Sequence, residues 1–196
     1  MLLAEIGSFK RGSGLQKTDF VPEGYPCIHY GEIYTYYNLA ATKTKSFITE
    51  DLALKLKKAH KDDLIITTTS ENMDDVCKAM VWEGDNDVAI GGHEVACTTS
   101  LNSRFLAYWL QTKEFYSQKK KLARGTKVIE ISAKNLGKIL VPIPPLSEQQ
   151  RIVDILDKFD ALVNDISQGL PAEIEARRKQ YEYYRDKLLT FKKKEV

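Results

Sequence analysis

The sequence predicts an α+β fold, in which a globular domain with a mixed or antiparallel sheet precedes an all-α pair of helices. Three observations lead to this prediction. Up to residue 146, short β-like segments alternate irregularly with a few helical segments, without a regular βαβ repeat. Three prolines then fall within residues 142–145. Residues 147–196 carry only helical patterns, so we divide the chain into residues 1–146 and 147–196.

The composition bounds the class of protein. A chain of 196 residues, 43% of them hydrophobic, is long enough for a compact core and an appendage. It has no apolar run long enough to span a bilayer, and its first residues lack the basic start of a signal peptide. Three cysteines, Cys27, Cys77 and Cys97, form neither a CxxC motif nor an even disulfide framework. We therefore expect a cytoplasmic protein with free thiols.

The first part of the chain contains several predicted elements. Residues 26–37 are aromatic and β-branched, which predicts a strand. Thr49 is placed to cap a helix that carries Leu52, Leu56 and Ala59 at helical spacing. Residues 63–70 predict a buried strand that enters a polar loop, and residues 77–100 predict two or three short strands. A helix starts at Asn102 or Ser103 and continues to residue 118, and residues 128–144 predict a strand, a helical turn and a strand.

The prolines predict a sharply defined start for the helical part. Ser147 to Gln150 form a capping-box pattern, in which Ser147 accepts from the Gln150 N–H and the Gln150 side chain reaches back to the Ser147 N–H. An apolar stripe then continues to residue 166. Gly169 and Pro171 are expected to end this helix and begin another, so the predicted helices span 147–167 and 171–194.

The second predicted helix carries side chains spaced as the a/d seam of a coiled coil. This seam consists of Ile174, Arg177, Tyr181, Tyr184, Leu188 and Phe191. Periodicity alone leaves two alternatives open, a core-facing amphipathic pair and an oligomerisation coiled coil. The order of the parts, a globular module followed by a rigid joint and a helical pair, favours a spacer.

The net charge of +2 hides an uneven distribution. Residues 61–94 contain nine acidic and two basic residues, whereas residues 113–127 contain six basic and one acidic residue. Gly125 is expected to end a helix there and to place Thr126 in a loop. The basic segment is suited to neutralise nucleic-acid phosphates through Lys119, Lys120, Lys121, Arg124 and Lys127. The alternative is a solvated helix end, since cations favour a helix C-terminus.

The segment VPIPPLSEQQRIVDILDKFDALV, residues 141–163, closely resembles the segment that closes each target recognition domain in specificity (S) subunits of type I restriction–modification systems. The segment ARRKQYEYYRDKLLTF, residues 176–191, resembles the spacer helix of that family. Residues 4–35 and 102–145 resemble the start and the second half of such a domain. The resemblance covers nearly the whole chain and is weakest near residues 60–100, the part expected to vary with the DNA target.

The resemblance implies a sequence-specific DNA-recognition subunit with no cofactor of its own. Residues 1–146 would be the target recognition domain, which reads one half-site of double-stranded DNA, and residues 147–196 the helical spacer. A full S subunit carries two of each, whereas this chain has room for one. It therefore resembles a half subunit, as a short form or a fragment, that pairs with a second copy through the seam. Two-fold pairing would imply a palindromic bipartite target.

The partners that the resemblance implies carry the chemistry. A modification (M) subunit would methylate adenine N6 with S-adenosylmethionine. A restriction (R) subunit would use ATP and magnesium to translocate and cut DNA. The helical spacer would dock the modification subunits.

Further candidates for DNA contact come from three other segments. Lysine and arginine can contact phosphates, and tyrosine can hydrogen-bond to a phosphate or stack on a base. Asparagine can read adenine N6 and N7, and glutamate can accept a hydrogen bond from cytosine N4. The alternatives are half-buried sheet tyrosines and ordinary loop chemistry. The candidates are Lys10, Arg11, Lys17, Tyr34, Tyr36, Ser70, Glu71 and Asn72.

The sequence offers little support for catalysis. It contains no P-loop and no GxSxG motif, and Ile143 stands where the base-holding motif of amino-methyltransferases has Asp or Asn. The pairs His93/Cys97 and Cys27/His29 do not match common zinc spacings, so we expect no metal. Two alternatives remain: a coiled-coil adaptor without a DNA role, and a small enzyme such as a nuclease in the acidic segment.

Overall fold

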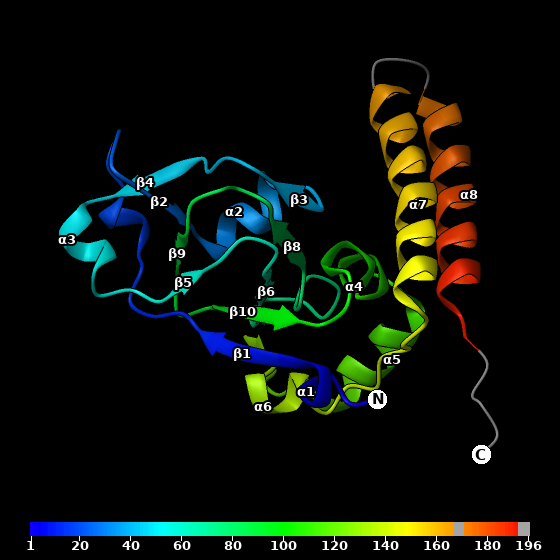
Figure 1. Cartoon of the computed structure of the whole chain (residues 1–196), viewed down its shortest axis with the longest axis horizontal. Coiled ribbons are helices and arrows are strands. Elements are labelled where there is room, and N and C mark those ends of the chain that lie inside the picture. Colours follow the sequence, from blue (N-terminus) through cyan, green and yellow to red (C-terminus); the bar gives the residue numbers. More distant parts are fainter. Residues whose placement is uncertain (167–170, 192–196) are drawn as a thin grey trace.

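The computed structural model describes residues 1–166 and 171–191. A mixed domain of short helices and strands lies beside a pair of long helices (Figure 1). This arrangement confirms the predicted fold class. The predicted helix stop at Gly169 and the predicted helix end at residue 194 lie outside the described residues.

Three sheets build the domain. Its strands are β1 Gly7–Arg11, β2 Tyr25–Ile28, β3 Ala40–Ala41, β4 Ser46–Ile48, β5 Lys58–Ala59, β6 Leu64–Thr67, β7 Thr69–Ser70, β8 Ala79–Trp82, β9 Val88–Ile90, β10 Glu94–Thr99 and β11 Ile129–Glu130. The largest sheet has the order β1-β10-β6-β8-β3, with β3 and β8 parallel and the other pairs antiparallel. The second has the order β4-β2-β9-β5, in which β2 and β9 are parallel. The third is an antiparallel ribbon of β7 and β11.

Short helices cover the sheets, and two long helices follow them. They are α1 Leu3–Ile6, α2 Tyr30–Thr35, α3 Glu50–Ala53, α4 Ser103–Trp109, α5 Lys113–Leu122, α6 Ala133–Leu136, α7 Leu146–Ile166 and α8 Pro171–Leu189, with a 3-10 turn at Lys17–Asp19. The predicted caps at Thr49 and Asn102 are confirmed, because each side chain accepts from a backbone N–H of the first turn. No helix among residues 1–166 and 171–191 is long and apolar enough to cross a membrane.

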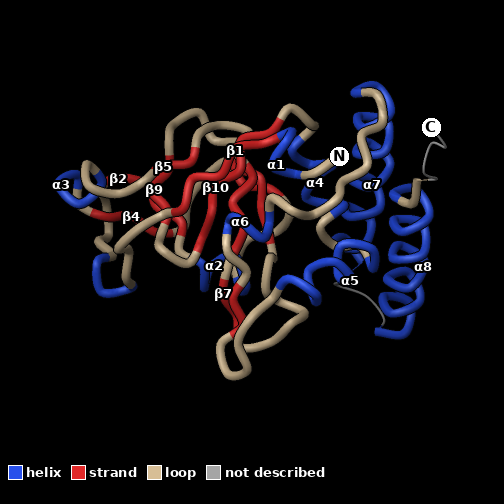
Figure 2. Tube along the Cα trace, turned by 90° about the horizontal axis from the view of Figure 1, so that it is seen from below, coloured by secondary structure: helices blue, strands red, loops and turns tan. Residues whose placement is uncertain are grey.

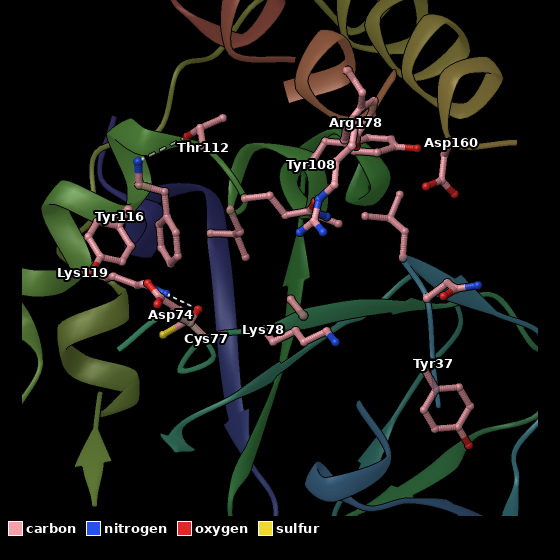
Figure 3. A pocket seen from close by; sticks show the side chains of 18 residues that line it. Tyr37, Asp74, Cys77, Lys78, Tyr108, Thr112, Tyr116, Lys119, Asp160 and Arg178 are labelled. Atoms are coloured by element: carbon pink, nitrogen blue, oxygen red, sulfur yellow. Dashed lines mark hydrogen bonds between the residues drawn. The ribbon is translucent and has the colours of Figure 1, made fainter. Parts of the chain in front are cut away.

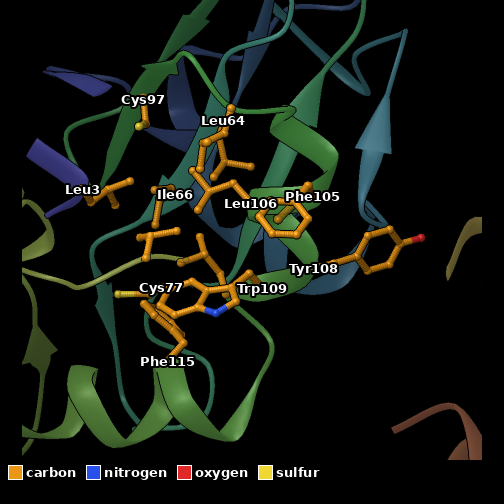
Figure 4. Packing of buried hydrophobic residues seen from close by; sticks show 14 of the residues in the cluster. Leu3, Leu64, Ile66, Cys77, Cys97, Phe105, Leu106, Tyr108, Trp109 and Phe115 are labelled. Atoms are coloured by element: carbon orange, nitrogen blue, oxygen red, sulfur yellow. The ribbon is translucent and has the colours of Figure 1, made fainter. Parts of the chain in front are cut away.

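The main hydrophobic core lies between the large sheet and the helices α4 and α5. Phe105, Leu106, Tyr108 and Trp109 of α4 are buried there against strand residues such as Leu64 (Figure 4). The base of α7 belongs to the same core through a buried face of Ile152, Val153 and Leu156. Each such aliphatic side chain contributes about 1.5–3 kcal/mol when fully buried. The long helices are therefore packed onto the domain rather than joined to it by the proline segment alone.

The second strand predicted within residues 128–144 is reduced to an isolated bridge between Leu140 and Leu2. Three other predicted elements also differ from the structure. The strand predicted over residues 26–37 ends at Ile28, because the ring of His29 accepts from the Gly31 N–H and caps α2. The helix predicted to reach Ala59 ends at Ala53, because Lys58 and Ala59 pair with β9. The helix predicted to continue to residue 118 divides into α4 and α5, because Thr112 forms a new cap. In each case a side-chain cap or a distant strand overrides local periodicity.

The helix α7 begins at Leu146, and the predicted capping box of Ser147 and Gln150 does not form. The Pro145 carbonyl accepts instead from the N–H groups of residues 148 and 149, at 2.9 and 3.0 Å. Gln149 and Gln150 are used for tertiary contacts: their Oε1 atoms accept from the backbone N and the side-chain Nδ2 of Asn102, at 2.8 and 2.9 Å. The glutamines therefore fasten α7 to the start of α4.

The helices α7 and α8 run side by side in opposite directions (Figure 1). A polar network ties α7 to the domain, with Arg104 of α4 at its centre. Arg104 makes two bonds to Glu83, at 2.6 and 2.8 Å, and one to Asp157 of α7, at 2.8 Å. The Tyr108 hydroxyl donates to the other oxygen of Asp157, at 2.6 Å. This network sets the direction in which the helical pair leaves the domain.

Candidate nucleic-acid interface

The ribbon of β7 and β11 brings together two segments that the sequence places far apart. Ser70 pairs with Ile129, and Thr69 pairs with Glu130. Because the strands are antiparallel, the loop after Ser70 and the loop before Ile129 leave the ribbon at the same end. Figure 2 shows these loops projecting beyond β7, away from the sheets. We call this surface, residues 70–72 and 124–128, the ribbon tip.

The ribbon tip contains predicted DNA contacts from both segments. Glu71, Asn72, Arg124, Thr126 and Lys127 are exposed, and Ser70 is half-buried. The prediction that Gly125 interrupts the basic helix is confirmed, since α5 ends at Leu122 and Gly125 has a φ of +97°, in the left-handed region.

Asn72 is less available for base contacts than the sequence suggested. Its side-chain oxygen accepts from the Asp75 N–H at 2.8 Å, and its side-chain nitrogen donates to Asp75 Oδ2 at 2.6 Å. The amide therefore closes a turn within its own loop. It would have to leave Asp75 in order to read a base.

Arg11 lies at the base of the ribbon. Its Nη2 atom is 3.3 Å from Glu130 Oε1, and its Nε atom donates to the Gly92 carbonyl at 3.1 Å. The Arg11 side chain remains 52% exposed, so the pair with Glu130 is a weak surface ion pair. Arg11 is thus accessible beside the ribbon tip.

The two predicted tyrosines lie on or beside α2 and have different surroundings. The hydroxyl of Tyr34 donates to the Thr69 carbonyl at 2.6 Å, which joins α2 to β7. Tyr36 is 56% exposed, and Lys45 Nζ lies 4.8 Å from its ring centroid. Tyr34 therefore stabilises β7 through a hydrogen bond, whereas the ring of Tyr36 is accessible to solvent.

The structure corrects the prediction for Lys119. This side chain is only 4% exposed, and its Nζ donates to the carbonyls of Asp74 and Val76, at 2.9 and 2.8 Å. It cannot also reach a phosphate, because the helix α5 turns it toward the loop after β7. Lys120 and Lys121, on the same helix, are exposed.

The remaining two lysines lie on separate surfaces. Lys10 is exposed, and its Nζ lies 3.1 Å from His60 Nε2 and 3.3 Å from the Lys58 carbonyl. Since neighbouring residues of a strand face opposite sides, Lys10 and Arg11 are not grouped. Lys17 is exposed in the 3-10 turn and lies close to His29, whose pKa its charge helps to lower.

Tyr30 and His93 lie between Lys17 and the ribbon, and the buried ring of His29 packs against Tyr30. The ring centroid of Tyr30 lies 4.4 Å from that of His29 and 4.9 Å from that of His93. His93 is exposed, and its Nδ1 atom is held 2.9 Å from Thr69 Oγ1. No sequence periodicity predicts this group, because its members come from the start of α2 and from the turn before β10. The exposed His93 ring and the half-buried Tyr30 ring are the members that a base could stack on, beside the basic side chains.

A buried carboxyl lies beneath this surface. Glu94 is fully buried; its Oε2 atom accepts from the Gly91 N–H, and its Oε1 atom has no hydrogen-bond partner among the described residues. Burial raises the pKa of Glu94 from its ordinary value of 4.5 to about 8. Burial, with the nearby charge of Lys17, lowers the pKa of His29 to about 4. Both groups are therefore neutral at pH 7.

The described residues offer no group of three His, Cys, Asp or Glu side chains that could hold a metal ion. Cys27, Cys77 and Cys97 are buried free thiols. Burial raises the pKa of each to about 12, so none is a thiolate at neutral pH.

The predicted coiled-coil seam packs largely within the chain itself. Tyr181, Leu188 and Phe191 are partly buried against the main core. The ring of Tyr184 stacks on Phe159 of α7, with centroids 5.8 Å apart. Arg177 is exposed and pairs with Glu173 at 2.8 Å, and the side chain of Ile174 lies outside the described part of the structure. The aromatic surface that remains open on α8 includes Tyr183, which is 61% exposed.

The sequence pattern described as "Type I restriction modification DNA specificity domain" matches residues 3–176. This chain belongs to that family. The match confirms the resemblance based on residues 141–163.

Individual relatives agree with this assignment. A putative type I restriction enzyme specificity subunit of Haemophilus influenzae is 33% identical over 154 residues, which cover 76% of this chain and 38% of the relative. The specificity subunit of the EcoR124I/EcoR124II type I restriction enzyme of Escherichia coli is 58% identical over 72 residues, 37% of this chain and 18% of the relative. The chain thus matches less than half the length of these relatives.

Solved structures share the fold. The S subunit of a type I system from M. genitalium superposes with a TM-score of 0.57 at 18% identity, over 86% of this chain and 40% of that chain. The HsdS subunit of Thermoanaerobacter tengcongensis gives a TM-score of 0.60 at 20% identity, over 96% of this chain and 44% of that chain.

Proposed function

We propose that this chain recognises one half-site of double-stranded DNA for a type I restriction–modification complex. The ribbon tip would enter a groove, with Arg124 and Lys127 on phosphates and Ser70 and Glu71 near base edges. Methylation and cleavage would be performed by partner subunits. The observation that carries this proposal is the β7–β11 pairing, which sets a polar loop beside a basic loop on one projecting surface.

The charge of the ribbon tip is the part to test first. Arg124→Glu with Lys127→Glu should weaken binding to a short mixed-sequence duplex. The plot of log K against log salt concentration has a negative slope, and each lost phosphate contact lowers the magnitude of that slope by about 0.9, so two contacts lower it by about 1.8. Fluorescence anisotropy at several salt concentrations measures both quantities.

A matched control is available at the other end of the domain. Lys55 and Lys57 are exposed near α3, which lies far from β7 in Figure 2. Reversing both charges changes the net charge by the same amount and should leave the salt slope nearly unchanged. If both double variants change affinity and salt slope equally, binding depends on the total charge of the chain and not on the ribbon tip. A wild-type chain without DNA affinity would favour the coiled-coil adaptor instead.

The helical pair would serve as spacer, docking surface for the modification and restriction subunits, and contact with a second copy. Arg104, Tyr108 and Asp157 support a fixed spacing role, because they hold α7 in one direction. Since Tyr181 and Leu188 pack inside the chain, changing them to glutamate would damage the fold as well as a dimer.

The exposed ring of Tyr183 gives a cleaner test of pairing. Tyr183→Glu should lower the molar mass found by light scattering without lowering the melting temperature. Lys179→Glu, one turn earlier on the exposed side of α8, is the control. A monomeric wild-type chain, or a dimer that survives Tyr183→Glu, would remove this face from the proposed interface.

A further inference from the structure

Lys119 is buried inside the domain, whereas its neighbours Lys120 and Lys121 are exposed. Its Nζ donates to the carbonyls of Asp74 and Val76, at 2.9 and 2.8 Å, and the side chain is 4% exposed. Figure 3 shows Lys119 extending from α5 toward Asp74 and Cys77. A buried ammonium requires such partners, since an unpaired one would be costly.

The two carbonyls belong to the loop between β7 and β8, which leaves the ribbon tip at Glu71. This loop has its own turn, in which Asn72 binds Asp75. It ends at Cys77, which has a φ of +68°, an uncommon conformation for a residue other than glycine. The Cys77 N–H donates to the Thr67 carbonyl at 3.0 Å. Lys119 binds the loop directly before this strained residue.

Lys119 also lies on the helix that leads into the second loop of the ribbon tip. The helix α5 ends at Leu122, and the chain then passes through Arg124 to Lys127 before it enters β11. The rings of Phe115 and Tyr116 hold the ammonium from the helix side, with centroids 5.7 and 5.3 Å from Nζ. One side chain therefore links the two loops at a point outside the β7–β11 pairing.

We propose that Lys119 is a positioning residue for DNA sequence recognition, which holds the loop of residues 71–77 in register with the loop of residues 124–128. This inference rests on the proposed function. A direct phosphate contact by Lys119 would affect all sequences and the salt slope alike. A positioning role affects the choice of sequence, because it sets where Ser70 and Glu71 meet the bases.

The test compares Lys119→Met with Lys120→Met. Methionine keeps most of the apolar stem and removes the ammonium, and Lys120 is the exposed neighbour on the same helix. Each chain selects duplexes from a pool with a randomised segment, and the selected pools are sequenced. We expect Lys119→Met to reduce the preference for the selected sequence over mixed-sequence DNA at least tenfold, with an unchanged salt slope. Lys120→Met should keep the preference and lower the magnitude of the salt slope by at most about 0.9.

Hydrogen exchange of the free protein supplies a readout without DNA. Lys119→Met should speed exchange of the amides of residues 75–78 at least tenfold relative to α4, and Lys120→Met should not. If Lys119→Met does not fold, Lys119→Gln, which keeps a donor for one carbonyl, replaces it with the same expectations. Unchanged exchange or unchanged sequence preference in the Lys119 variant would overturn the proposal, as would a fall in the magnitude of the salt slope.

The two proposals fail in different ways. If the wild-type chain selects no sequence, the proposed function fails, and the role of Lys119 in recognition falls with it even if the exchange result is as expected. If the wild-type chain selects a sequence and Lys119→Met selects the same one as strongly, only the positioning role fails.

Discussion

Asp157 offers a quantitative test of how the helical pair is fixed to the domain. Its two oxygens accept from Arg104 Nη1 at 2.8 Å and from the Tyr108 hydroxyl at 2.6 Å. Tyr108 is 1% exposed, so Asp157→Ala leaves a buried hydroxyl without its acceptor. Loss of such a hydrogen bond to a charged group costs about 1.5–3 kcal/mol.

The ion pair adds a smaller contribution. The side chains of Arg104 and Asp157 are 34% and 35% exposed, so solvent screens their attraction. Such a pair contributes about 0.5–1 kcal/mol, and Arg104 keeps its two bonds to Glu83. We therefore expect Asp157→Ala to lower the free energy of unfolding by about 2–4 kcal/mol in total.

Urea denaturation followed by circular dichroism measures this change. The slope of free energy against urea should stay constant, since the loss is of stability and not of compactness. Tyr108→Phe combined with Asp157→Ala completes a double-mutant cycle, with an expected coupling of about 1–2 kcal/mol. Asp154→Ala, on the exposed side of α7, is the matched control and should cost less than about 0.5 kcal/mol. Equal costs for Asp154→Ala and Asp157→Ala, or zero coupling, would refute this account of the junction.

Three further predictions address pH, capping and backbone conformation. Since folding raises the pKa of Glu94 from 4.5 to about 8, the folded chain keeps a proton that the unfolded chain releases, and the contribution to stability falls as pH rises through this window. Glu94→Gln should flatten that fall in denaturation curves taken from pH 6 to 9, and an unchanged slope would contradict it. Asn102→Ala removes the cap of α4 and the side-chain bond to Gln150 of α7, and should cost at least about 1–2 kcal/mol in urea denaturation; a loss below about 0.5 kcal/mol would show that the cap is dispensable. Gly125→Ala places a Cβ against the Val128 carbonyl at a left-handed φ, which should distort the loop of residues 124–128. We expect a clear loss of DNA affinity with little change in melting temperature, and an unchanged affinity would contradict a role of this loop in DNA binding.

Several features of the chain could be predicted from the sequence because they depend on near neighbours. Thr49 and Asn102 act as caps, Gly125 lies in a loop after the basic helix, and the prolines precede a long helix. The family could also be recognised, because residues 141–163 form one continuous motif. Caps, turns and helical periodicity depend on residues a few positions apart, so the amino-acid sequence is enough to identify them.

Other features were decided by contacts between distant segments. Residues 30–35 alternate like a strand, yet the His29 cap and the packing of Tyr34 beneath Thr69 make them a helix. The ring group of His29, Tyr30 and His93 had no sequence signal, since it exists only where the start of α2 meets the turn before β10.

The basic segment and the helical seam show this limit most clearly. The sequence determined that residues 119–127 are basic and that α8 carries an aromatic repeat, but not which of these side chains face solvent. Only the fold turned Lys119 inward to bind Asp74 and Val76, and only the fold packed Tyr181 and Leu188 partly buried against the core. The physical reason is that burial depends on strand register and helix docking over tens of residues, and these long-range contacts leave no local pattern.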